Sequence, residues 1–203
     1  MITLTPSTPC TAVLKRHPGT SSQAIQGIEA RVRWMEDGAL ALTYTLNGDS
    51  TRLQIPPPRP PRRADRLWHH TCFEAFIAVK GNSEYYEFNF APSGEWAAYA
   101  FRRYRDGAPL VDEELAPRIS VRSAENGLEL DAIIRSDRLP ALQPAAPLRL
   151  ALSAVIEEDG GMLSYWALTH PPGTPDFHHP DAFALEIKTR DVVAVNNPTL
   201  GKR

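Results

Sequence analysis

The chain has 203 residues and a formal net charge of −2. Its acidic and basic residues are interspersed, so it lacks the basic surface that nucleic-acid binding requires. No apolar run approaches the roughly 20 residues that span a bilayer. The first residues also lack the basic-then-apolar order of a signal peptide. These features exclude nucleic-acid and membrane partners and lead us to expect a cytoplasmic protein.

The length suits one domain covering residues 1–203, with residues 1–27 and 190–203 as peripheral segments. Only Cys10 and Cys72 are present. Two cysteines are too few for a disulfide framework and do not have the spacing of a metal motif. We therefore expect both thiols to be free.

The first half of the chain predicts a β-hairpin followed by a proline-rich connector. Residues 28–35 and 39–46 have strand patterns and are separated by a turn ending in Asp37-Gly38. A second turn is indicated by Asn47-Gly48. Residues 55–63, IPPPRPPRR, cannot form a hydrogen-bonded ladder because proline has no amide donor. This segment is predicted to be extended and stiff.

The centre of the chain carries three further strand patterns. Residues 71–80 are rich in β-forming side chains, and residues 85–90, YYEFNF, alternate between aromatic and polar groups. The turn signal between them predicts a hairpin. Residues 96–104 are predicted to be a third strand, although their alanines would also suit a helix.

Alternation along residues 85–90 sorts the side chains between two faces of the predicted sheet. Phe88 and Phe90 point to one face, which we assign to the core, and Glu87 and Asn89 point to the other. Glu74 can join these polar groups from the neighbouring strand. The sequence therefore predicts an open, half-solvated sheet face that carries carboxylates, an amide and aromatic rings.

The second half of the chain continues the same pattern of short strands and tight turns. Strand patterns occupy residues 118–122, 127–135, 148–157, 162–169 and 183–187. The turns between them are rich in glycine, asparagine and aspartate, and no long helix is indicated. We predict an all-β fold, an antiparallel β-sandwich of jelly-roll type.

Several of these segments, taken in order, resemble a known family. They are Trp68, residues 71–77 (TCFEAFI), residues 86–96 (YEFNFAPSGEW) and residues 164–168 (SYWAL). Together they resemble the DOMON-like superfamily that includes family 9 carbohydrate-binding modules, over roughly residues 28–187. The superfamily also contains haem binders and many bacterial proteins of unassigned function.

The resemblance implies non-catalytic binding of a saccharide or a similar polar ligand on the open sheet face. In such modules two aromatic rings clamp a sugar, and Trp68 and Trp166 are the candidate clamp. The groups implied to bond the sugar hydroxyls are Glu74, Glu87, Asn89 and Arg102. No cofactor is firmly implied, although acidic turns such as residues 112–114 and 157–159 could hold a structural calcium.

Two enzymatic hypotheses remain open from the residues alone. The loop HPPGTPDFHHPD, residues 170–181, could support a metal-dependent enzyme if its imidazoles and carboxylates converge. The candidate ligands in this loop are His170, Asp176, His178 and His179. Glu74 and Glu87 could also form a glycosidase pair, since directly opposite residues on adjacent strands lie roughly 5 Å apart. Haem ligation by a histidine is a further alternative, but no axial pair can be named.

Overall fold

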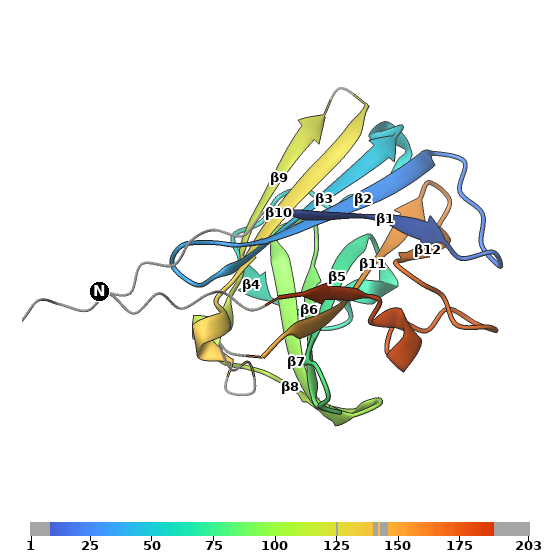
Figure 1. Cartoon of the computed structure of the whole chain (residues 1–203). Helices are drawn as coiled ribbons and strands as arrows, with labels where there is room; N and C mark the ends of the chain where they lie inside the picture. Colours follow the sequence, from blue (N-terminus) through green and yellow to red (C-terminus); the bar gives the residue numbers. More distant parts are fainter. Residues whose placement is uncertain (1–8, 125, 140–141, 143–145, 189–203) are drawn as a thin grey trace, which may run out of the picture.

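The structure is a computed structural model that describes residues 9–124, 126–139, 142 and 146–188. Two sheets face each other as layers (Figure 1). The described residues contain strands and short 3-10 turns but no α-helix, and none of those turns could cross a bilayer. The predicted all-β sandwich is therefore confirmed.

The first sheet consists of five antiparallel strands, and the order is β1, β2, β3, β10 and β9. Their bounds are β1 (Cys10–Arg16), β2 (Ile25–Trp34), β3 (Leu40–Gly48), β10 (Gly127–Ile134) and β9 (Arg118–Ala124). The outer positions of these strands are mostly polar and exposed, as expected for a sheet with one solvated face.

The second sheet carries the residues that matter most for function. In order, it contains β4 (Arg62–Arg63), β7 (Glu95–Arg103), β6 (Tyr85–Phe90), β5 (Cys72–Val79), β11 (Leu148–Glu158) and β12 (Met162–Ala167). Two short strands lie beside this path: β8 (Asp106–Pro109) pairs with β7, and β13 (Leu185–Ile187) pairs with β11. All pairings are antiparallel except that of β4 with β7.

Five 3-10 turns connect the strands at the edges of the sandwich. They are η1 (Ser50–Arg52), η2 (Leu67–His69), η3 (Glu113–Leu115), η4 (Ser136–Arg138) and η5 (Pro180–Ala182). The η2 turn stands beside β5, β6 and β7, which places its side chains at the outer face of the second sheet.

The main core lies between the two sheets and is built by strict alternation. Phe88 and Phe90 of β6 are fully buried there, as predicted, and Phe73 and Ile77 of β5 join them. Because successive strand residues point to opposite faces, Glu87 lies on the outer face of the same strand.

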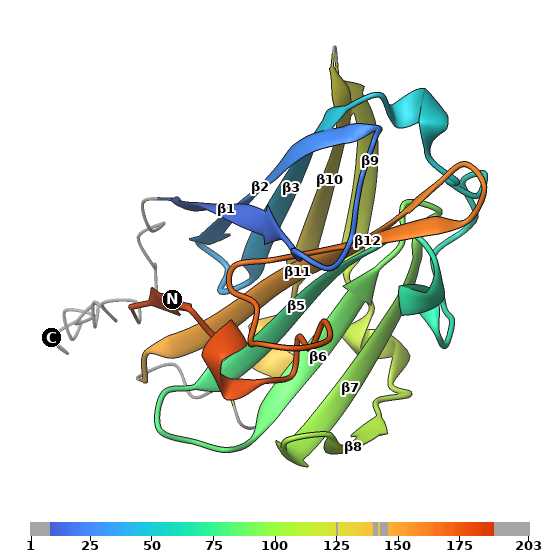
Figure 2. The same ribbon diagram turned by 90° about the vertical axis from the view of Figure 1, so that its right-hand side faces the viewer.

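The outer face of the second sheet is covered rather than open, which corrects the sequence-based expectation. Every residue of β5 and β6 is buried. The chain that follows β12 passes over this face before it reaches η5 (Figure 2). Phe183 of that segment packs on Phe76 and Tyr85, and Phe177, whose ring meets Tyr165, belongs to the same second apolar cluster. Polar groups on this face are therefore enclosed in a pocket.

The terminal segments and the proline-rich connector can be compared with the sequence-based expectation in the same way. Within the segment 1–27 that was expected to be peripheral, β1 belongs to the sandwich: it pairs with β2 and, through Lys15 and Arg16, with β12. Residues 190–203 lie outside the described residues. The proline-rich connector has no assigned strand before β4, where Arg62 donates from Nε to Glu95 at 2.8 Å.

The backbone conformation of Gly48 leads to a prediction about the stability of the protein. Gly48 has a φ of +146°, and a Cβ there would overlap the carbonyl oxygen of Ala24. We expect Gly48→Ala to lower the free energy of unfolding by more than about 1 kcal/mol in urea denaturation. The control is Gly27→Ala, because a Cβ at Gly27 meets no atom within 4 Å. A Gly48→Ala variant as stable as the wild type would contradict this geometry.

Candidate ligand-binding pocket

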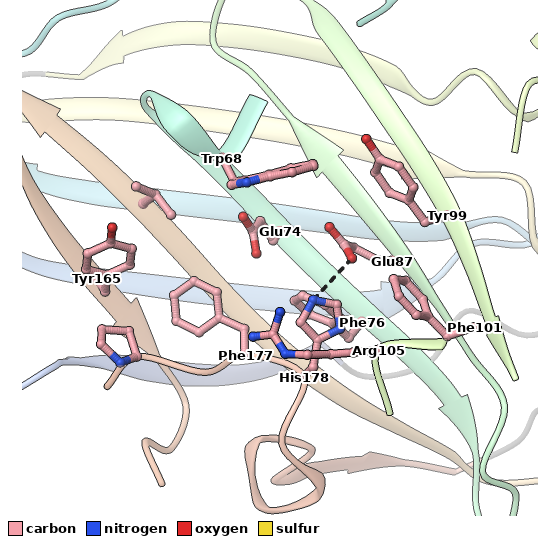
Figure 3. A pocket seen from close by; sticks show the side chains of 12 residues that line it. Trp68, Glu74, Phe76, Glu87, Tyr99, Phe101, Arg105, Tyr165, Phe177 and His178 are labelled. Atoms are coloured by element: carbon pink, nitrogen blue, oxygen red, sulfur yellow. Dashed lines mark ion pairs between the residues drawn. The ribbon is translucent and has the colours of Figure 1, made fainter. Parts of the chain in front are cut away.

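A pocket of about 310 Å³ lies on the outer face of the second sheet, between η2 and the segment that follows β12 (Figure 3). Strands β5, β6, β7, β11 and β12 each contribute to its lining. The lining residues are Trp68, Glu74, Phe76, Glu87, Tyr99, Phe101, Arg105, Val155, Tyr165, Pro175, Phe177 and His178.

The pairing of β5 with β6 brings two carboxyl groups to the floor of the pocket. Glu74 is directly opposite Asn89, and Phe76 is directly opposite Glu87. Glu74 and Glu87 are therefore diagonal neighbours, with backbones roughly 7 Å apart rather than the roughly 5 Å of a directly opposite pair. Both carboxyl groups face the pocket interior (Figure 3).

Glu74 is held in a strongly desolvated position. Its residue is 3% exposed, and Ser153 Oγ donates a hydrogen bond to Oε2 at 3.3 Å. Burial, and then the neighbouring Glu87, raise the pKa of Glu74 well above its usual range. The Ser153 hydrogen bond acts in the opposite direction but does not outweigh burial.

Glu87 has a similar but better hydrogen-bonded environment. Asn89 Nδ2 donates to its Oε1 at 2.7 Å, and this bond together with the charge of Arg105 favours the ionised form. Burial is the larger effect and raises the pKa of Glu87 to about 7. The two pocket carboxyls therefore retain protons at a pH where exposed glutamates have lost them.

His178 closes one side of the pocket as a neutral imidazole. Its Nε2 lies 3.7 Å from Glu87 Oε2, and its Nδ1 lies 2.9 Å from the hydroxyl of Tyr85. Burial, and then the charge of Arg105, lower the pKa of His178 to about 4. The contact with Glu87 is therefore not an ion pair at neutral pH, although its distance alone would allow one.

The backbone of Arg105 favours one tautomer of His178. Its amide donates to the Tyr85 hydroxyl at 3.2 Å, so the hydroxyl proton is free to be donated to His178 Nδ1. In that tautomer the remaining imidazole proton is on Nε2, the atom that faces Glu87.

Asp176 ties the covering segment to the turn between β7 and β8. Its Oδ1 accepts from Arg105 Nη2 at 2.8 Å and from the His178 amide at 3.1 Å. Its Oδ2 accepts from the Tyr104 hydroxyl at 2.7 Å. Arg105 has a φ of 54°, a left-handed conformation that turns its side chain toward this carboxylate. Asp176 thus holds both Arg105 and His178 against the pocket.

Trp68 forms the opposite wall and is the most accessible aromatic group of the site. Its residue is 38% exposed, and its ring meets Tyr99 edge-on at a centroid distance of 5.9 Å. The η2 turn that carries it follows Arg66, whose φ of 62° reverses the chain direction just before the indole. Trp68 thus lines the same pocket as the two carboxyl groups, with its indole on the side of Glu74 (Figure 3).

Three of the six site residues predicted from the sequence line this pocket, and three do not. Trp166 is 4% exposed in the core between the sheets, and its Nε1 donates to Ser164 Oγ at 3.0 Å. The predicted clamp of Trp68 with Trp166 is therefore wrong. Asn89 is fully buried and supports Glu87 from below, and the Arg102 side chain is 82% exposed and pairs with Asp106.

The histidine-rich loop does not assemble a metal centre. His170 Nε2 lies 2.8 Å from the carbonyl oxygen of Lys15, and His179 accepts from the amide of Asp181 at 3.2 Å. Asp176 is engaged by Arg105, so only His178 of the four candidates enters the pocket. Within residues 9–124, 126–139, 142 and 146–188, no three His, Cys, Asp or Glu side chains are grouped to hold a metal ion.

Sequence reasoning missed several aromatic and charged lining residues. Tyr99 and Phe101 could have been found, because alternation places them opposite the core residue Trp96, and Tyr99 is directly opposite Glu87. Tyr165 could not be found in this way, because its face depends on the burial of its neighbour Trp166, which the sequence does not indicate. Arg105 could not be found, because a register shift after Phe101 decides which arginine points inward.

Solved structures of other proteins share the fold of this chain. No family model matches the sequence, and no curated protein matches it. A Bacteroides uniformis protein, provisionally described as carbohydrate-binding, superimposes with a TM-score of 0.60 at 13% identity, over 84% of this chain and 82% of that one. The chain therefore shares the β-sandwich fold of that protein.

A second solved structure shares the fold. It is a family 9 carbohydrate-binding module from Caldicellulosiruptor kristjanssonii in complex with cellotriose. The TM-score is 0.51 at 11% identity, over 93% of this chain and 88% of that one.

The buried carboxyls predict an unusual pH dependence of stability. The pKa of Glu87 is raised to about 7 in the folded protein, so the folded state keeps a proton that the unfolded chain releases from pH 4.5 upward. The stabilising contribution is therefore complete below about pH 4.5 and is lost as the pH rises through 7. Glu87→Gln cannot ionise, and we expect it to be more stable than the wild type at pH 8, by up to about 3 kcal/mol.

Urea denaturation at pH 5 and pH 8 checks this expectation. The matched control is Glu186→Gln, whose carboxylate is exposed and pairs with Lys80. That control should not gain stability at pH 8. A Glu87→Gln variant less stable than the wild type at both pH values would show that Glu87 is ionised and well compensated.

The hydrogen bonds of Asp176 lead to a prediction about amide hydrogen exchange at His178. Asp176→Ala removes the acceptors of Arg105, Tyr104 and the His178 amide. Losing a partly exposed ion pair makes local opening easier by about 1 kcal/mol. We expect roughly fivefold faster amide hydrogen exchange at His178. Asp181→Ala, in the same segment but with an exposed carboxylate, should leave that exchange unchanged; equal exchange in both variants contradicts the assignment.

Proposed function

We propose that the protein binds a saccharide non-covalently in the pocket between Trp68 and His178. The observation that carries this proposal is that a partly exposed indole and two carboxyl groups line the same pocket of about 310 Å³. A sugar ring has an apolar face and a rim of hydroxyl groups, so it complements an aromatic wall beside polar groups.

Each polar lining group has a role that its environment supports. Glu74 and Glu87 accept hydrogen bonds from hydroxyl groups when ionised and can also donate when protonated. Arg105 donates from its guanidinium group, and His178 donates or accepts according to its tautomer. Trp68 and Tyr99 offer the apolar contact surface.

The fold supports the same proposal. One structural neighbour is provisionally described as carbohydrate-binding, and the other was solved with cellotriose. We further propose that the chain is a DOMON-like domain related to family 9 carbohydrate-binding modules. The quoted sequence segments from Trp68 to residues 164–168 motivate this narrower assignment.

Calorimetric titration against a panel of monosaccharides and short oligosaccharides tests the proposal. We expect Trp68→Ala to weaken binding tenfold or more, because a central aromatic contact typically accounts for about 2 kcal/mol. Trp68→Phe should retain part of the affinity. Val111→Ala, which changes a residue that is 71% exposed and does not line the pocket, should bind like the wild type.

Two results would count against saccharide binding at this pocket. One is the absence of binding by any panel sugar, and the other is unchanged binding by Trp68→Ala. Product analysis after prolonged incubation distinguishes binding from hydrolysis, because a protein that only binds leaves every oligosaccharide intact. Release of shorter sugars that stops in Glu87→Gln would replace binding by glycoside hydrolysis.

A further inference from the structure

The pocket contains acidic groups without a matching positive charge. Among the described residues, neither Glu74 nor Glu87 forms an ion pair with a lysine or an arginine. The nearest basic side chain is His178, at 3.7 Å from Glu87, and its pKa of about 4 makes it neutral at physiological pH. A bound cation would therefore supply the positive charge that the pocket lacks beside Glu74 and Glu87.

Arg105 does not provide that balance, although it lines the same pocket. Its guanidinium group is 2.8 Å from Asp176, whose side chain is only 16% exposed. The two charges compensate each other at the rim. Arg105 does favour the ionised form of Glu87, yet the pKa of Glu87 still rises to about 7 because burial has the larger effect.

The remaining walls are also suited to a positive group. Six aromatic rings line the pocket, and they come from η2, three strands and the covering segment. The rings are those of Trp68, Phe76, Tyr99, Phe101, Tyr165 and Phe177. Aromatic faces attract cations, and the attraction is stronger in a site shielded from water. A neutral sugar would use one or two such rings, but it would bring no positive charge to favour the ionised form of the two carboxyls.

We propose that the ligand carries an ammonium group, and that it is an amino sugar with a free amine rather than a neutral or N-acetylated sugar. This inference rests on the proposed saccharide binding and narrows it. The ammonium group is placed beside Glu74 and Glu87, beneath Trp68, while the sugar hydroxyls meet Arg105 and His178. Charge-assisted hydrogen bonds to the carboxylates then replace the water that burial has removed.

Calorimetry with matched sugars tests the inference directly. Glucosamine, galactosamine and mannosamine are each compared with the parent hexose and with the N-acetyl form, at pH 7.5 and low salt. We expect at least one free amine to bind tenfold or more tightly than both of its neutral counterparts. In Glu74→Gln and in Glu87→Gln, the ratio of amine to hexose affinity should fall toward one.

The outcomes separate this inference from the function on which it depends. Equal affinity for an amine and its parent hexose overturns the inference and leaves saccharide binding intact. Tighter binding of the N-acetyl form also overturns it. Absence of binding by every sugar overturns both proposals. Glu186→Gln is the matched control, because its carboxylate is exposed and does not line the pocket. It should keep the wild-type ratio, and a fall in that ratio also overturns the inference.

Discussion

The register between β5 and β6 is the constraint on which both the core and the pocket depend. It places Phe88 and Phe90 between the sheets and, on the reverse face of the same strands, sets Glu74 diagonal to Glu87. A slip of one residue would exchange the two faces, so that carboxyls would enter the core. The burial of the aromatic residues therefore fixes the position of the acidic groups.

The covering segment converts that face from a solvated surface into an enclosed site. Phe177 and Phe183 supply its apolar contacts, and Asp176 supplies its polar attachment to the sheet. Enclosure raises the pKa of the two carboxyls and lowers that of His178, because burial disfavours every charged form. Buried ionisable groups whose pKa is shifted reduce the stability of the fold, and such groups are characteristic of functional sites.

Much of the sandwich could be predicted from the sequence, because alternation and turn chemistry are local signals. The strand 85–90 and both of its faces follow from YYEFNF alone. The position of Trp166 could not be predicted, since a tryptophan in a strand is exposed or buried according to which sheet faces it. Arg105 and the cover over Glu74 depend on a register shift and a long return of the chain, and neither has a local signature.

The stiff proline-rich connector has a consequence for the wall that Trp68 forms. Proline fixes φ, and the connector is anchored where the Arg59 amide donates to Ser93 and where Arg62 binds Glu95. Trp68 follows within a few residues, on a turn whose own amides bond back to Arg66 and Leu67. A molecule entering the pocket therefore meets an aromatic surface that is already in place, and its association need not immobilise a loose segment.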